Sequence, residues 1–64
     1  MRLYEKYAKL RDERGLTDYR VANDTGIATA TLTEWKKGTY KPKIEKLMLI
    51  AKYFGVDVKE LLDD

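Results

Sequence analysis

The residues best suited to chemistry lie between Thr17 and Gly38, where two short helical patterns meet at Gly26. Glycine adopts a positive φ without a Cβ penalty, as a tight turn between two helices requires. In the second pattern Leu32 and Trp35 are three residues apart, so they share one apolar face of a helix. The opposite face carries Thr29, Ala30, Thr33, Glu34 and Lys37. A short helix that is anchored on one face in this way fits a DNA major groove, which makes DNA contact the leading hypothesis.

A cluster of lysines follows this helix. Residues 36–46 contain five lysines and one glutamate, a local charge of +4 in a chain whose net charge is +2. A basic segment on a nearly neutral body is suited to bind phosphate groups. By itself the segment is equally compatible with a solvated loop. Tyr40, inside the segment, is open in the same way between contacting phosphate and packing on the core.

The composition argues against catalysis and against metal binding. The sequence contains no cysteine, histidine or serine. These absences remove the commonest general base, the commonest metal ligand and two standard nucleophiles. Asp18 and Asp24 lie in one predicted helix, but two carboxylates without further oxygen ligands favour a solvated helix face over a metal site. We therefore expect no enzyme activity, no metal, no cofactor and no small-molecule ligand.

Length and hydropathy indicate one small domain that spans residues 1–64. A chain of this size buries only about 60% of the surface that it exposes when unfolded. The longest apolar run is the five residues 47–51, which is far too short to cross a membrane. The opening segment MRLYEKYAKL also lacks the uninterrupted apolar core of a secretory signal. We expect a cytoplasmic protein with no membrane partner.

The elements before the central stretch are predicted from spacing and caps. Apolar residues recur at Leu3, Tyr7 and Leu10, which indicates an amphipathic helix over residues 3–14. Gly15 is expected to end this helix in the left-handed conformation. Thr17 is then the predicted N-cap of the next helix, because its hydroxyl can accept a hydrogen bond from a backbone N–H of the first turn.

Two further helices are predicted after the central stretch. Pro42 indicates an extended connection, since proline fixes its own φ and disfavours helix at the preceding residue. A helical pattern then runs from Lys43 to Phe54, with a broad apolar stripe that consists of Ile44, Leu47, Met48, Ile50, Ala51 and Phe54. Asp57 is the expected N-cap of a last short helix, with Glu60 completing a capping box. That helix is expected to bury Val58, Leu61 and Leu62.

These elements predict an all-α fold, a compact five-helix domain whose helix-turn-helix spans about residues 17–37. The sequence resembles the DNA-binding domain of the phage repressor and Cro-type helix-turn-helix family, also called the XRE family. The resemblance covers roughly residues 3–62 and implies a lambda-repressor-like arrangement. The matching segments, in chain order, are LRDERGLT (10–17), VANDTGI (21–27), LTEWKKG (32–38), Pro42 and IEKLMLIAKYFGVDVKELL (44–62).

The resemblance implies which residues contact DNA. A helix over about residues 17–24 lies across the backbone, and a recognition helix over about 29–37 enters the major groove. The positions that match base contacts are Thr29, Ala30, Thr33 and Glu34. The positions that match backbone contacts are Thr17, Asp18, Lys37, Thr39, Tyr40, Lys41 and Lys43. Threonine and alanine can contact a thymine methyl group and glutamate can accept from a cytosine amino group, so we expect modest base specificity with a large share of backbone and shape recognition.

Two departures from the family pattern concern charge. Asp18 stands where family members commonly have glutamine, so its carboxylate is expected to repel phosphate unless Arg20 or another cation neutralises it. Lys36 occupies a position that is often acidic and pairs with the arginine that corresponds to Arg11. Arg11 must therefore find another acid, or face solvent or phosphate.

Two other departures concern the ends of the central helices. Ala28 stands where the family usually has serine or threonine, which leaves Thr29 or the backbone to cap the recognition helix. Thr25, before the turn glycine, replaces an aliphatic residue. Both changes are local and leave the predicted fold intact.

The resulting hypothesis is a DNA-binding transcription regulator, such as a repressor, of phage or bacterial type. Its partner is double-stranded DNA, bound as a homodimer on half-sites about 34 Å apart. That dimer forms through exposed surface of the last helices, or only on DNA. The alternative is a protein-interaction module on the same fold, with weak or no operator binding.

Overall fold

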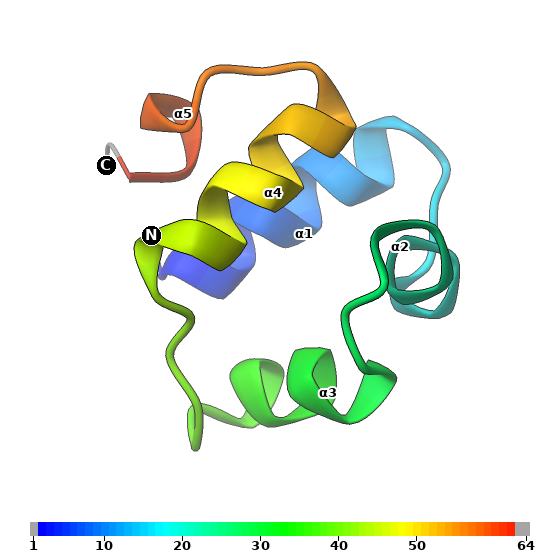
Figure 1. The fold of residues 1–64 in the computed structure, drawn as a ribbon, viewed down its shortest axis with the longest axis vertical. Coiled ribbons are helices and arrows are strands. Elements are labelled where there is room, and N and C mark those ends of the chain that lie inside the picture. The colour runs from blue at the N-terminus through cyan, green and yellow to red at the C-terminus, as the bar shows by residue number, and fades with distance from the viewer. Residues whose placement is uncertain (1, 63–64) are drawn as a thin grey trace.

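The computed structural model describes residues 2–62, and all of the regular structure in that range is helical. The helices follow one another through short connections (Figure 1). The predicted all-α fold with five helices is confirmed. They are α1 (Leu3–Glu13), α2 (Asp18–Thr25), α3 (Thr29–Lys37), α4 (Ile44–Phe54) and α5 (Lys59–Leu62).

The first helix ends where the sequence predicts a stop. Gly15 has a φ of +65°, and its N–H donates to the Asp12 carbonyl at 3.0 Å. The N–H of Leu16 reaches back to the Arg11 carbonyl at 3.1 Å. These two bonds satisfy carbonyls at the end of α1, which closes one residue earlier than the periodicity predicts.

The core is built mainly from one apolar face of each helix. Tyr7, Val21 and Leu61 are fully buried, although they come from α1, α2 and α5. The Tyr7 ring stacks on Phe54 of α4 with a centroid distance of 5.9 Å and lies 5.0 Å from Trp35 of α3. Aromatic rings therefore join three helices that are distant in sequence, and each such pair adds about 0.5–1.5 kcal/mol beyond the burial of its area.

The predicted burial of the last two helices is partly wrong. Leu47, Ile50 and the other inward residues of α4 are buried, but Ile44 and Met48 are 46% and 57% exposed. Leu62 of α5 is also 49% exposed. The apolar stripe of α4 is wider than the surface that its neighbouring helices cover, and this leaves an exposed apolar strip at Ile44 and Met48, four residues apart on one face.

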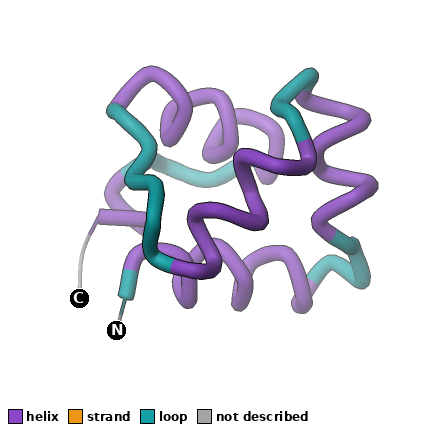
Figure 2. Tube along the Cα trace, turned by 90° about the horizontal axis from the view of Figure 1, so that it is seen from below, coloured by secondary structure: helices purple, strands orange, loops and turns teal. Residues whose placement is uncertain are grey.

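The arrangement sets α3 apart from α5. In Figure 1, α3 lies along the lower edge of the molecule, while α5 lies at the upper end beside α4. The longest connection among the described residues, 38–43, links α3 to α4 and is visible as an extended loop in Figure 2. The outer side of α3 and this loop therefore lie on the same part of the surface.

Candidate nucleic-acid interface

The helix-turn-helix consists of α2, α3 and the turn between them. Thr17 caps α2 as predicted, because its Oγ1 accepts the N–H of Arg20 at 3.1 Å. Gly26 has a φ of +82°, and its N–H donates to the Ala22 carbonyl at 2.9 Å. The left-handed glycine ends α2 and lets the chain turn sharply into α3.

The hydroxyl of Thr25 makes two hydrogen bonds in this turn. Its Oγ1 donates to the Val21 carbonyl at 2.7 Å and accepts the N–H of Ile27 at 3.3 Å. One hydroxyl thus satisfies a carbonyl at the end of α2 and an N–H beyond the glycine. The threonine that departs from the aliphatic family pattern replaces apolar packing with two hydrogen bonds across the turn.

The recognition-helix candidate α3 is anchored on one side only. Leu32 and Trp35 are 1% and 4% exposed, which confirms that Trp35 is a core residue. The Trp35 ring meets Tyr4 edge-on at a centroid distance of 5.3 Å. The predicted base-contact positions Thr29, Ala30, Thr33 and Glu34 all lie on α3 and are all exposed.

The start of α3 has no side-chain cap. Ala28 is extended, and its carbonyl accepts the N–H of Thr31 at 3.0 Å. Thr33 Oγ1 donates to the Thr29 carbonyl at 3.2 Å. The backbone therefore takes the place of the serine or threonine cap that is usual in the family, and the first-turn N–H groups of α3 lie at the exposed end of the helix.

Glu34 is tied to the loop that follows α3. Its carboxylate accepts a short hydrogen bond from the Thr39 hydroxyl, which also reaches the Glu34 carbonyl at 3.1 Å. The N–H of Thr39 donates to the same carbonyl at 3.0 Å. Among the predicted backbone contacts, Thr39 therefore also fixes the path of the loop after Gly38.

The predicted phosphate contacts near the end of α3 lie on its last residue and on the extended loop that follows it. Lys37, Lys41 and Lys43 are exposed, whereas Tyr40 is half-buried and packs against the core. Pro42 is buried and holds the loop against the domain. We call residues 36–43 the basic loop; within it lysines are exposed on either side of Tyr40.

Asp18 is the first residue of α2, and its carboxylate is held by residues of α1. Tyr4 and Tyr7 donate their hydroxyls to it at 2.8 and 2.7 Å, and Arg11 Nη1 donates at 2.7 Å. Burial alone raises the pKa of the carboxyl, but the hydrogen bonds from Tyr7, Arg11 and Tyr4 outweigh it, so the pKa of Asp18 lies below its ordinary value. Arg11, not Arg20, is the cation that neutralises this carboxylate.

The same contacts raise the pKa of Tyr7. Burial, followed by the hydrogen bond to Asp18, raises the pKa of Tyr7 well above its ordinary value. The hydroxyl therefore remains a donor at all physiological pH values. The sequence indicated that Arg11 needed another acid; Asp18, seven residues later and across the Gly15 turn, is that acid.

Asp24 and Arg20 form a second ion pair within α2, and a hydrogen bond from Tyr53 links its carboxylate to α4. Arg20 Nε lies 2.8 Å from Asp24 Oδ2, and the Tyr53 hydroxyl donates to the same oxygen at 2.5 Å. The hydrogen bonds from Tyr53 and then Arg20 lower the pKa of Asp24. Tyrosine and arginine side chains donate to both carboxylates of α2. The described residues include no group of three or more acidic side chains that could hold a metal ion.

One residue beside the interface was missed by the sequence reasoning. Arg2, at the start of α1, donates from Nη2 to the carbonyl of Lys36 at the end of α3, at 3.3 Å. Nothing in its spacing predicts this contact, because the two residues are 34 positions apart. The packing of α1 against α3 brings this arginine to the end of α3.

Comparison with known proteins identifies the family. Residues 8–61 match the family model described as Helix-turn-helix. The chain belongs to this helix-turn-helix family, of the XRE type. None of the helices in residues 2–62 is long and apolar enough to cross a membrane.

Three relatives are transcription regulators by name. The chain is 41% identical over 59 residues to the cryptic phage CTXphi transcriptional repressor RstR of Vibrio cholerae, covering 92% of this chain and 53% of the repressor. It is 33% identical over 63 residues to the HTH-type transcriptional regulator DdrOP3 of Deinococcus deserti, covering 98% and 49%. It is 32% identical over 62 residues to the HTH-type transcriptional activator BcrR of Enterococcus faecalis, covering 97% and 30%. The chain thus spans about half or less of the length of these relatives.

Proposed function

We propose that this chain is a DNA-binding module of a transcription regulator, with α3 as its recognition helix. The observation that carries the proposal is the two-sided character of α3: Leu32 and Trp35 are buried, while the residues on its outer side are exposed and are not covered by the domain. A helix of this kind can enter a major groove and keep its support. The relatives named as a repressor, a regulator and an activator support a role in transcription without favouring one sign of regulation.

In this proposal the contacts fall into two groups. Thr29, Ala30, Thr33 and Glu34 contact base edges or the groove. Thr17 at the start of α2 and the basic-loop residues Lys37, Thr39, Tyr40, Lys41 and Lys43 contact the phosphate backbone. Asp18 acts indirectly: its carboxylate positions Arg11 and the first turn of α2, whose N–H groups are directed toward phosphate.

The base-contact group predicts low sequence selectivity. The glutamate of this group already accepts a hydrogen bond from Thr39, so reading a cytosine amino group requires it to share or give up that bond. Thr29, Ala30 and Thr33 offer methyl groups and single hydrogen bonds from a hydroxyl, and none of them can form a bidentate pair of hydrogen bonds with a base. Phosphate contacts then supply most of the affinity, which makes binding strongly dependent on salt.

The proposal is tested with labelled duplexes and two variants. The double variant Lys37→Ala/Lys41→Ala should weaken binding to all duplexes alike and reduce the slope of log Kd against log salt by about one unit for each lost phosphate contact. Thr33→Ala should instead change the ranking of duplexes with little effect on that slope. Both are measured by fluorescence anisotropy across a salt series.

A lysine variant on α5 serves as the control for the loss of positive charge. Lys59→Ala removes one positive charge from α5, away from α3, and should leave the slope unchanged. Wild-type protein that does not bind any duplex at low salt would contradict the proposal and favour a protein-interaction module on the same fold.

A homodimer is part of the proposal. The exposed apolar side chains Ile44, Met48 and Leu62 lie on α4 and α5 and offer the surface through which two copies can meet, in solution or on DNA. Site selection from random duplexes tests this arrangement: a dimer selects paired half-sites at a fixed spacing near one helical turn of about 34 Å. Selection of single half-sites would contradict it.

A further inference from the structure

The side chain of Arg2 lies between α1 and the end of α3. Its Nη2 donates to the Lys36 carbonyl at 3.3 Å, and it is the nearest side chain to Gly38, where an added Cβ would lie 3.6 Å from it. Its backbone N–H donates to Glu5 Oε1 at 2.8 Å, which fixes the start of α1. The guanidinium is thus held beside the first residues of the basic loop.

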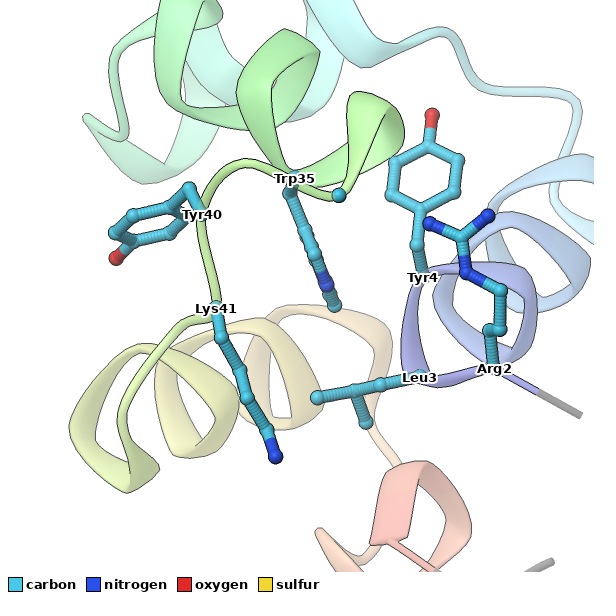
Figure 3. Close-up of a pocket in the computed structure, with 7 residues that line it drawn as sticks. Arg2, Leu3, Tyr4, Trp35, Tyr40 and Lys41 are labelled. Carbon is cyan, nitrogen blue, oxygen red and sulfur yellow. The ribbon is translucent and has the colours of Figure 1, made fainter.

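Arg2 and Lys41 flank one pocket. A pocket of about 260 Å³ opens between the start of α1 and the basic loop, and of the seven described residues that line it two are cationic and none is acidic. In Figure 3, Arg2 and Lys41 lie on opposite sides of it, with Leu3 and Trp35 between them. Two cations that are 39 residues apart in the sequence therefore line one pocket.

The chemistry of Arg2 suits an oxygen anion. A guanidinium has five N–H donors in a planar fork, and the Lys36 carbonyl uses one of them. A carbonyl at the C-terminal end of a helix carries partial negative charge, so the bond to Lys36 orients the arginine without neutralising it. The remaining donors match the oxygens of a phosphodiester, which Arg binds in a bidentate manner.

We propose that Arg2 is a DNA-backbone contact, which binds a phosphate at the mouth of this pocket together with Lys41. The inference rests on the proposed function, because the phosphate belongs to the duplex that α3 enters. It extends the phosphate-binding surface from the basic loop to the start of α1. Because Arg2 donates to the Lys36 carbonyl at the end of α3, it also helps to position the recognition helix relative to the DNA backbone.

Two substitutions separate charge from structure. Arg2→Gln keeps a side-chain amide that can donate to the Lys36 carbonyl but removes the charge, whereas Arg2→Lys keeps the charge. The probe is a labelled duplex of mixed sequence, and the measured quantity is the slope of log Kd against log salt. Arg2→Gln should lower the magnitude of the slope by about 0.9 and weaken low-salt binding several-fold, equally for all duplexes. Arg2→Lys should restore most of the slope.

The outcomes distinguish this inference from the proposed function. Lys59→Gln is the matched control, since it makes the same charge change on α5. If wild-type protein binds duplexes and Arg2→Gln keeps the wild-type slope, Arg2 is only a structural link to α3 and the inference is overturned while the proposed function stands. If wild-type protein binds no duplex at any salt, both are overturned. Thermal unfolding of each variant shows whether a change in affinity comes from loss of the fold.

Discussion

Asp18→Asn tests the hydrogen-bonded cluster that joins α1 to the start of α2. The substitution keeps the size and shape of the side chain but removes its charge and replaces one acceptor oxygen with a donor. Asp18 accepts from Tyr4, Tyr7 and Arg11, so at least one of these donors must turn away or lose its partner. Arg11 loses its least exposed ion pair.

The magnitude follows from burial. Breaking a fully buried ion pair costs about 3–5 kcal/mol. The Arg11 and Asp18 side chains keep 18% and 25% of their exposure, so solvent compensates part of this loss. We expect Asp18→Asn to lower the free energy of unfolding by about 2–3 kcal/mol, since hydrogen bonds to charged groups each contribute about 1.5–3 kcal/mol. That is a large share of the roughly 3–10 kcal/mol expected for a domain of this size.

The loss of stability in Asp18→Asn is expected to depend on pH. The folded-state pKa of Asp18 is lowered, so its stabilisation is complete above the unfolded pKa of about 3.9 and is lost as the pH falls through the folded value. The difference between wild type and Asp18→Asn should therefore be largest near about pH 7 and shrink in acid. Urea denaturation followed by the fluorescence of the single, buried Trp35 measures it.

A matched control is present on the same arginine. Asp12 also contacts Arg11, with Nη2 at 2.9 Å from its Oδ1, but its side chain is 68% exposed. Asp12→Asn should cost less than about 1 kcal/mol, as exposed ion pairs do. Equal costs for the two variants, or a cost for Asp18→Asn that persists unchanged in acid, would refute the reasoning.

Two further predictions concern the turn between α2 and α3. Gly26→Ala should lower the free energy of unfolding by about 1–2 kcal/mol, because an alanine at a φ of +82° strains the backbone. The space around the new Cβ is open, so no steric clash adds to this cost. A thermal midpoint equal to that of wild type would contradict the prediction. Thr25→Val keeps the shape of the side chain but removes both turn hydrogen bonds, so it should cost about 1–2 kcal/mol in urea denaturation, and a stabilised variant would show that apolar packing suffices at this position.

Local sequence signals predicted the elements well because each depends on neighbouring residues. The N-cap at Thr17 and the positive φ at Gly26 were predicted correctly from neighbouring residues. The bounds of α3, which the family resemblance implies, were also predicted correctly. The same periodicity overestimated the buried surface of α4, since it shows that Ile44 and Met48 share an apolar face but not whether another helix covers that face. Coverage depends on the position of α5, and no local pattern encodes that position.

The candidate site also has features that the sequence predicts and contacts that only the tertiary structure decides. The exposed face of α3 and the lysines of the basic loop follow from residue spacing, so the sequence predicts both. The partner of Arg11, the tie between Glu34 and Thr39, and the contact of Arg2 with Lys36 each depend on where a flexible side chain ends. A charged residue has many potential partners at similar sequence distances, and only packing selects among them.

The sequence by itself determined the five helices and the glycine turn at their centre, because caps, glycines and apolar periodicity act over a few residues. Its ordered motifs carry the resemblance to the helix-turn-helix family, to which the chain belongs. The tertiary structure decided how charge is distributed over the surface. It turned the Asp18 carboxylate toward α1, and it brought Arg2 to the end of α3. Electrostatic interactions act through space between groups that folding brings together, so their partners are fixed only when the helices have packed.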